Sequence, residues 1–133
     1  MLFFDTSFIL GLFNENDDNH HKVKKILEMN PDISKQKKAI NNIVLTEVLN
    51  KIKKDYYRNV RVNIINFLLS MDEIYHVEDE DYLKAIELMQ YYKYTVNYSD
   101  CLIILSMFNN NIDTIVSFDS DFNRIDGINR IYI

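Results

Sequence analysis

Short apolar segments alternate along this chain with longer segments in which apolar residues recur every three or four positions. The short segments have the length of buried strands, and the longer ones have the periodicity of helices that pack one face against a core. Strands are predicted at residues 2–4, 38–42, 73–77, 114–117 and 130–133. Helices are predicted at residues 6–13, 17–29, 43–55, 59–70 and 99–109, and one more begins after the acidic run at 78–81.

The order of these elements predicts the fold class. Strands separated by helices of ten or more residues are typically parallel and joined by right-handed crossovers. We therefore expect a three-layer α/β/α fold, with a central parallel sheet of four to five strands, in one domain spanning residues 1–133. In sheets of this kind, functional sites form beyond the carboxyl ends of the strands.

Local signals add detail to the predicted helices. Asp17 or Asp18 is expected to cap the second helix, and the segment Asn30-Pro31-Asp32 is expected to end it. Ser99 is the expected cap of the apolar helix at 99–109. The helix after the acidic run is expected to turn four residues inward: Tyr82, Ala85, Ile86 and Met89.

Four acidic residues stand where this fold would bring them together. Asp5 follows the first strand and Asp119 follows the strand at 114–117, so both belong to the carboxyl edge of the sheet. Glu47 and Asp100 lie near the starts of helices that enter from the same edge. Two carboxylates about 4 Å apart repel by roughly 4 kcal/mol at an effective dielectric of about 20. Converging carboxylates must therefore take up protons or hold a cation.

The surrounding residue types favour a hard divalent cation. Cys101 is the lone cysteine and no histidine cluster accompanies the acids, and oxygen ligands suit Mg²⁺ or Mn²⁺. Each acid taken singly also has a structural interpretation, which is the better one for that residue alone. Asp100 would interact with a helix dipole, Asp119 would open a turn, and Glu47 would occupy an exposed helix position.

The charge of the chain is segregated. The net charge is −5, but eleven of the fifteen Lys and Arg and only four of the twenty Asp and Glu lie between Lys22 and Arg61, which gives that stretch +7 and the remainder −12. This asymmetry fits a basic surface for phosphates beside an acidic region. It also fits the solvated faces of two helices, and charge alone favours that simpler interpretation.

The sequence also carries an expectation about localisation. Asp5 comes too early for a signal peptide, and no apolar run approaches the roughly 20 residues that span a bilayer. A soluble, cytoplasmic protein with no membrane partner is expected. The single cysteine excludes an intramolecular disulfide and agrees with a reducing compartment.

Four short motifs, taken together, resemble the PIN-domain family. They are Leu-Phe-Phe-Asp-Thr-Ser at 2–7, Leu-Thr-Glu-Val-Leu at 45–49, Tyr-Ser-Asp-Cys-Leu at 98–102 and Ser-Phe-Asp-Ser-Asp-Phe at 117–122. Each motif is short, but their order and spacing match over essentially the whole chain. The sequence looks most similar to the compact VapC-type toxins of toxin–antitoxin pairs.

This resemblance implies a metal-dependent endoribonuclease in which a metal-activated water attacks a phosphodiester bond of RNA, with tRNA and rRNA as candidate substrates. The implied catalytic residues are also the implied ligands of Mg²⁺ or Mn²⁺: Asp5, Glu47, Asp100 and Asp119. The family pattern further suggests hydroxyls of Ser7 and Ser117 near the metal, Asp121 as the substitute if Asp119 is not the fourth acid, and a structural role for His20 or His21.

The resemblance also suggests partners. An antitoxin protein is expected, and so is a homodimer to which the apolar helix at 60–69 contributes. The basic stretch between Lys22 and Arg61 would position the RNA backbone. Six tyrosines could stack on unpaired bases, although most of them are better explained as core or interface residues: Tyr56, Tyr57, Tyr91, Tyr92, Tyr94 and Tyr98.

Two other functions compete with the nuclease. One is a catalytically inactive module of the same fold that acts as a scaffold or regulator, and the presence of all four acids argues against it. The other is a phosphoacceptor domain like bacterial receivers, which also places an aspartate after a strand. That function would need a pair of carboxylates at the first strand and a lysine after the last, and no lysine follows residue 93.

Overall fold

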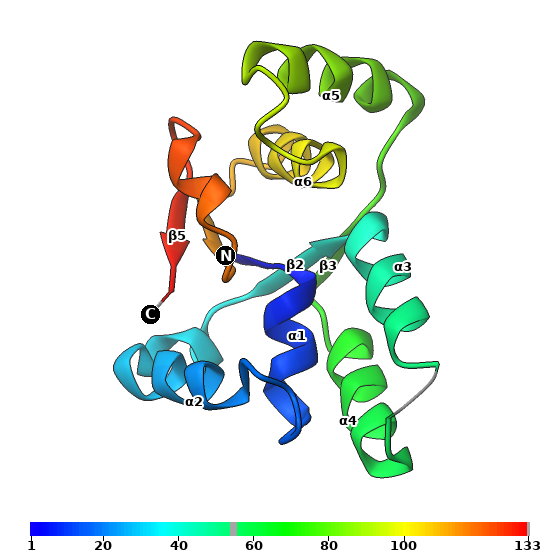
Figure 1. Ribbon diagram of the computed structural model, residues 1–133, viewed down its shortest axis with the longest axis vertical. Coiled ribbons are helices and arrows are strands. Elements are labelled where there is room, and N and C mark those ends of the chain that lie inside the picture. Colours follow the sequence, from blue (N-terminus) through cyan, green and yellow to red (C-terminus); the bar gives the residue numbers. More distant parts are fainter. Residues whose placement is uncertain (54–55, 133) are drawn as a thin grey trace.

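Five parallel strands form one sheet in the computed structural model, which describes residues 1–53 and 56–132. The strand order is β3-β2-β1-β4-β5, and every neighbouring pair is parallel. The strands are β1 (Leu2–Phe4), β2 (Lys38–Asn41), β3 (Glu73–Tyr75), β4 (Thr114–Val116) and β5 (Asn129–Ile131). The predicted α/β fold with a central parallel sheet is confirmed (Figure 1).

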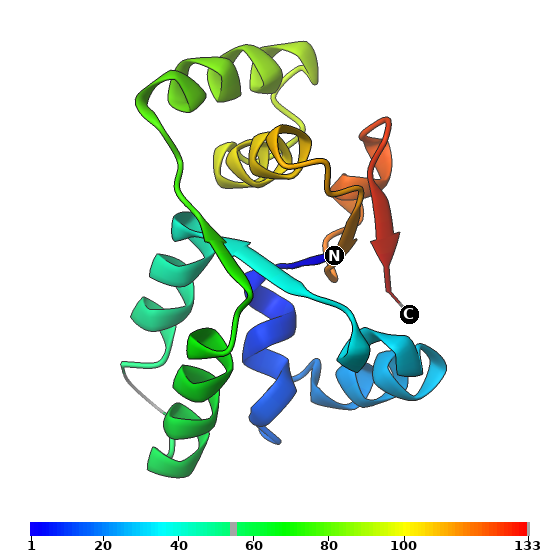
Figure 2. The ribbon, with the colours of Figure 1, turned by 180° about the vertical axis from the view of Figure 1, so that it is seen from behind.

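In the part of the chain that the structure describes, six α-helices cover the two faces of the sheet. Four lie on one face: α1 (Thr6–Phe13), α2 (His20–Met29), α3 (Asn42–Lys51) and α4 (Arg58–Leu69). On the other face, α6 (Tyr98–Asn109) packs on the sheet and α5 (Asp79–Tyr91) lies outside α6, as Figures 1 and 2 show. Two short 3-10 helices complete the order, η1 (Pro31–Lys35) and η2 (Ser120–Arg124). Within the described residues, no helix is both long enough and apolar enough to span a bilayer.

The core lies on both sides of the central strands. Phe3, Ile40 and Ile115 have no exposed surface, because helices cover both faces of the sheet and keep water away from these central strands. Helix α6 buries most of its residues, from Asp100 to Met107. Its near-continuous apolar sequence is therefore explained by contact with the sheet on one side and α5 on the other.

The structure corrects two predicted helix starts. Helix α2 begins at His20, because the Asp17 carboxylate accepts a hydrogen bond from the Asn19 N–H at 2.8 Å and so closes a turn before the helix. Helix α6 has Asn97 as its N-cap residue, not Ser99. The predicted ends of the helix at 43–55 and of the last strand at 133 lie outside the described residues.

The inward face of α5 is also narrower than predicted. Ala85 is fully buried, but Tyr82 is 38% exposed and Ile86 is 46% exposed. The reason is that α5 packs mainly on α6, so a single strip of its surface is covered. The acidic run does start this helix as expected, with a reciprocal capping box between Glu78 and Asp81, an arrangement that satisfies two helix N–H groups.

Candidate active site

Asp5 joins the end of β1 to the start of α1. Its backbone N–H donates to the carbonyl of Val116 at 3.1 Å, which ties it to the end of the neighbouring strand β4. One carboxylate oxygen accepts the N–H of Thr6 at 2.8 Å and caps α1, and the other accepts the Ser117 hydroxyl at 2.6 Å. The side chain is 8% exposed. Asp5 is therefore held rigidly at the carboxyl edge of the sheet.

Ser117 connects Asp5 to Asp119. It directly follows β4 and is fully buried. Its hydroxyl donates to Asp5 and accepts the backbone N–H of Asp119 at 3.0 Å. Asp119 in turn accepts the N–H of Asp121 at 2.9 Å and caps η2. The Asp121 carboxylate faces Arg124 instead, at 3.9 Å, so the geometry favours Asp119 over Asp121 as the member of the cluster.

Glu47 reaches the same place from α3. This helix starts at β2 because the Asn41 side chain accepts the Val44 N–H at 3.0 Å, and the Asn41 amide also donates to the Ser106 hydroxyl of α6 at 3.1 Å. The Glu47 carboxylate then accepts the hydroxyl of Thr6 at 2.7 Å. One buried asparagine and one threonine thus fix α3 relative to both α6 and α1.

Asp100 lies in the first turn of α6 and is 7% exposed. Burial raises its pKa to about 8, and a hydrogen bond shared with the Asp119 carboxyl and repulsion from Asp5, Asp119 and Glu47 add to the rise. Burial is also the largest cause of the raised pKa of Asp5; its hydrogen bonds from Ser117 and Thr6 oppose the rise, and the charges of Glu47 and Asp119 add to it. All four predicted acids therefore lie close enough for their charges to interact.

These acids have no basic partner in the part of the chain that the structure describes. The ion pair seen in residues 1–53 and 56–132 joins Arg124 to Asp121, outside the cluster. Buried carboxylates without a counter-charge are costly. The cluster is therefore an anionic site that a cation or protons must neutralise.

Comparison with known proteins places this geometry in a family. The sequence model of the PIN domain matches residues 2–128. The chain belongs to the PIN-domain family. No match was found among curated protein sequences.

Solved structures of a toxin and of toxin–antitoxin complexes share the fold. VapC20 of Mycobacterium tuberculosis, described as a sarcin-ricin loop cleaving toxin, superimposes with a TM-score of 0.73 at 24% identity, over 93% of this chain and 94% of that one. A toxin–antitoxin complex from Klebsiella pneumoniae gives 0.71 at 24% identity, over 99% and 98%. VapBC2 of Rickettsia felis, bound to a promoter DNA fragment, gives 0.68 at 20% identity, over 98% and 97%.

The donor set of this PIN domain fits a hard divalent cation. All four side chains offer carboxylate oxygens, the ligands that Mg²⁺ and Mn²⁺ prefer. Within the described ranges, no three Asp, Glu, His or Cys side chains already form a closed ligand set. Side-chain rotations would therefore be needed for these carboxylates to turn to a common ion.

The serines and the histidine that were predicted near the site differ in what they contact. Ser117 is in contact with two acids, whereas Ser7 is half-buried in the first turn of α1. The His20 ring lies 2.6 Å from the Gly11 carbonyl, which joins α2 to α1 and agrees with a structural role.

Sequence reasoning missed two supporting residues of the PIN-domain site. Thr6 holds Glu47, and its position directly after Asp5 was the available signal. Arg130 of β5 donates to the Ser117 carbonyl at 3.1 Å and lies 3.7 Å from the centre of the Tyr132 ring. No local pattern marks Arg130, because its contacts depend on the pairing of β4 with β5.

Ser117→Ala should weaken the binding of a divalent ion by about 10- to 100-fold, the usual cost of losing a group that orients a metal ligand. The substitution removes the hydroxyl that fixes both Asp5 and the N–H of Asp119. Titration calorimetry with Mn²⁺ measures the effect, with the exposed Ser120→Ala as the control. Equal affinities in the two variants would show that Ser117 does not orient the site.

Proposed function

We propose that this PIN domain is a metal-dependent endoribonuclease and the toxin of a VapBC-type toxin–antitoxin pair. The observation that carries the proposal is the cluster of Asp5, Glu47, Asp100 and Asp119 at the carboxyl edge of the sheet, buried or half-buried and with no basic partner in the described residues. In the absence of a cation, protonation must relieve this repulsion, and a purely structural role gives no reason to bring four carboxylates together. The cluster is therefore best explained as a site for Mg²⁺ or Mn²⁺.

The residues of the cluster and those around it have different proposed roles. Asp5, Asp100 and Asp119 would hold the principal ion, and Glu47 would join them directly or through a water. When bound, the ion supplies Lewis-acid stabilisation of the phosphate and lowers the pKa of a water. Ser117 orients Asp5 and Asp119, and Thr6 orients Glu47. This support on short, rigid connections keeps the carboxylates in place while RNA binds.

An RNA substrate is supported by the charge distribution. The stretch from Lys22 to Arg61 carries +7 and supplies α2, β2, α3 and the start of α4, so it can hold the phosphate backbone. The toxin role is supported by the fold shared with VapC20 and with toxin–antitoxin complexes. The chain would act in the cytoplasm, where tRNA and rRNA are found.

Incubation of the purified chain with tRNA and with rRNA tests this function. We expect endonucleolytic fragments with Mg²⁺ or Mn²⁺ and none with EDTA. Inducible expression in a bacterial host should arrest growth, and co-expression of an antitoxin from an adjoining reading frame should restore it. Intact RNA under all metal conditions, together with normal growth, would favour the inactive scaffold instead.

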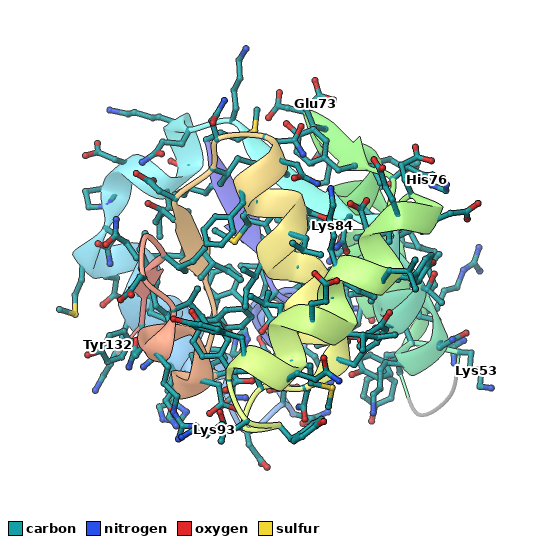
Figure 3. The ribbon with its side chains drawn as sticks, turned by 90° about the horizontal axis from the view of Figure 1, so that it is seen from above. Lys53, Glu73, His76, Lys84, Lys93 and Tyr132 are labelled. Carbon is teal, nitrogen blue, oxygen red and sulfur yellow. The ribbon has the colours of Figure 1, made fainter. Side chains whose placement is uncertain are left out.

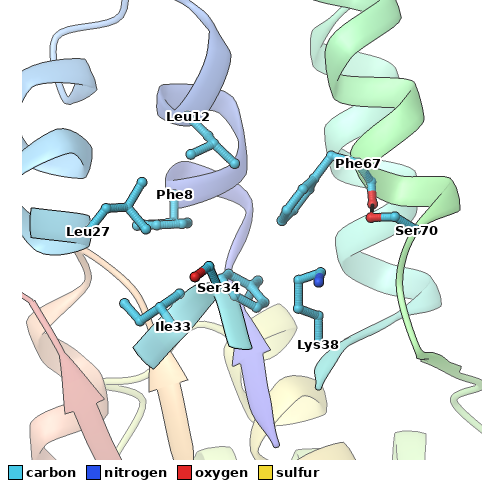
Figure 4. Close-up of a pocket in the computed structure, with 9 residues that line it drawn as sticks. Phe8, Leu12, Leu27, Ile33, Ser34, Lys38, Phe67 and Ser70 are labelled. Carbon is cyan, nitrogen blue, oxygen red and sulfur yellow. Dashed lines mark hydrogen bonds between the residues drawn. The ribbon is translucent and has the colours of Figure 1, made fainter. Parts of the chain in front are cut away.

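An apolar pocket of about 240 Å³ supports an antitoxin partner. Large side chains from α1, α2, η1 and α4 line it, and Figure 4 shows them facing one another across it. They include Phe8, Leu12, Leu27, Ile33 and Phe67. Because related folds were solved as toxin–antitoxin complexes, we propose that an apolar side chain of the antitoxin occupies this pocket.

Ser34→Trp should reduce antitoxin affinity by at least about tenfold, because a large ring at the exposed rim of the pocket competes with the incoming side chain. RNA cleavage by the free variant should be unchanged. Lys84→Trp on α5, in the opposite layer (Figure 3), is the control. The measurement is the affinity for the co-expressed antitoxin. Equal affinities of both variants would exclude the pocket as the antitoxin site.

A homodimer remains part of the proposal. Val62, Ile65 and Leu69 form one stripe on α4 and are 46%, 40% and 79% exposed. Burial of such a stripe against a second copy is favourable, which supports the predicted contribution of this helix to a dimer.

A further inference from the structure

A second pocket, of about 310 Å³, lies where the C-terminal end of α1 meets the N-terminal end of α4. Its wall is polar, unlike that of the pocket between α1, α2 and α4. Six of the side chains that line it carry polar groups: Asn14, Asn16, Asn59, Asn63, Glu15 and Tyr57. None of them belongs to the acidic cluster, and the proposed cleavage chemistry does not use them.

These side chains have the chemistry that recognises a nucleobase. Each asparagine amide both donates and accepts hydrogen bonds, so several of them can pair with the edge of a base. The Glu15 carboxylate accepts only, which suits the exocyclic amine of adenine, cytosine or guanine. The Tyr57 ring is 70% exposed, and an exposed aromatic ring beside such a pocket offers a stacking surface.

The pocket is held together across two chain segments. Asn14 ends α1, and its side chain accepts the Asn16 N–H at 3.2 Å. The Tyr56 side chain lies beside that of Asn14, which brings the segment before α4 next to the segment after α1. The two walls are thus joined by side-chain contacts as well as by the packing of α1 on α4.

Charges of both signs lie around the pocket, and Asp17, beside Tyr56, is one of the acids. Glu15 lies in the wall, whereas Arg58 lies between Tyr57 and Asn59 in the sequence. Arg61 follows the pocket residue Val60 in the sequence, and its guanidinium donates to the carbonyls of Ile52 and Lys53 at 2.8 and 3.3 Å. An amine-bearing base would meet Glu15, and its sugar–phosphate would lie toward the arginines.

Helix α1 sets the distance between the pocket and the acids. Asp5 caps its start and Asn14 its end, and a helix of eight residues is about 12 Å long. A short length of single-stranded RNA can cover that distance. The pocket would therefore take a base close to the cut, but not at it.

We propose that this pocket binds one amine-bearing base of single-stranded RNA and sets the sequence preference of cleavage. The effect on cleavage rests on the proposed nuclease function, whereas the binding of a base to the pocket does not. It needs no metal and no cleavage. It can therefore be tested when cleavage is prevented.

Fluorescence anisotropy with short labelled oligo-A, oligo-C and oligo-U, in EDTA, measures the binding. Oligo-A and oligo-C should bind more tightly than oligo-U, which lacks an exocyclic amine, and Glu15→Ala should remove this preference. Tyr57→Ala should weaken binding of all three by about tenfold, the usual effect of losing one stacked base. Tyr57→Phe should retain wild-type affinity, since it keeps the ring.

Tyr91→Ala is the matched control, because that ring is 74% exposed and lies on α5. Unchanged affinity in Tyr57→Ala, or equal binding of the three oligonucleotides, would overturn the proposal. The proposal would also be overturned if Tyr57→Ala bound RNA normally but self-associated differently from the wild type in sedimentation. That result would show that the pocket is a protein contact. If the pocket binds as expected and the wild type never cleaves RNA, only the nuclease function fails.

Discussion

Asp100→Asn should reduce RNA cleavage by at least about a thousandfold, because losing the metal costs several kcal/mol of transition-state stabilisation and each 1.4 kcal/mol is about a factor of ten. Asn keeps the size of the side chain and removes one ionisable oxygen. The variant should fold, since the side chain that it replaces is buried among three other acids. Gel analysis of tRNA and rRNA fragments, with a circular dichroism melt of the same preparation, measures both properties.

Asp5→Asn should behave in the same way, because Asp5 faces Ser117 and lies within the same cluster. Asp79→Asn is the control: its side chain is exposed in the first turn of α5, away from the cluster. It should cleave RNA at the wild-type rate. Full activity in both Asp5→Asn and Asp100→Asn would remove these residues from the active site.

The second large expected effect is on how the stability of the metal-free protein depends on pH. The pKa of Asp100 is raised from 3.8 to about 8 in the folded chain, so the folded state binds more protons than the unfolded state between about pH 4 and pH 8. Stability then falls as pH rises through this window. In EDTA we expect the melting temperature to drop by about 4 °C or more between pH 5 and pH 8.

Mn²⁺ should reverse this drop. The ion binds the ionised carboxylates of the folded chain, so it should raise the melting temperature more at pH 8 than at pH 5. Asp100→Asn has no proton to lose there, and in EDTA at pH 8 it should melt above the wild type. A wild-type profile that rises from pH 5 to pH 8 in EDTA would contradict the burial and repulsion assigned to Asp100.

Much of the fold and the positions of the acids could be predicted from the sequence. The alternation of apolar segments predicted the parallel sheet. That sheet places Asp5 and Asp119 at the same edge, because Asp5 directly follows β1 and Asp119 comes shortly after the neighbouring strand β4. Glu47 and Asp100 followed from helices that start at this edge. These inferences need only periodicity and the direction of parallel strands.

The contacts that orient the acids could not be predicted in this way. Ser117 is 112 positions from Asp5, and Thr6 is 41 positions from Glu47. Hydrogen bonds of this kind depend on strand register and helix placement to within an ångström, which composition and periodicity do not contain. The same limit explains the exposure of Ile86, because the apolar pattern of α5 does not reveal that a single helix covers it.

The polar pocket also could not be predicted from the sequence. Asn14 and Asn63 belong to separate segments, and asparagines near helix ends ordinarily indicate caps and turns. Only the packing of α1 against α4 brings them to one wall. Tyr57 could be named from the sequence as a stacking residue, but its place beside these amides could not.

The central claim is that four carboxylates share a divalent ion, and anomalous diffraction from crystals grown with Mn²⁺ tests it most directly. We predict a manganese peak bound by oxygens of Asp5, Asp100 and Asp119, with Glu47 as a further ligand or connected through a water. Ordered crystals at saturating Mn²⁺ with no peak among these side chains, or with the ion bound only elsewhere, would contradict the account.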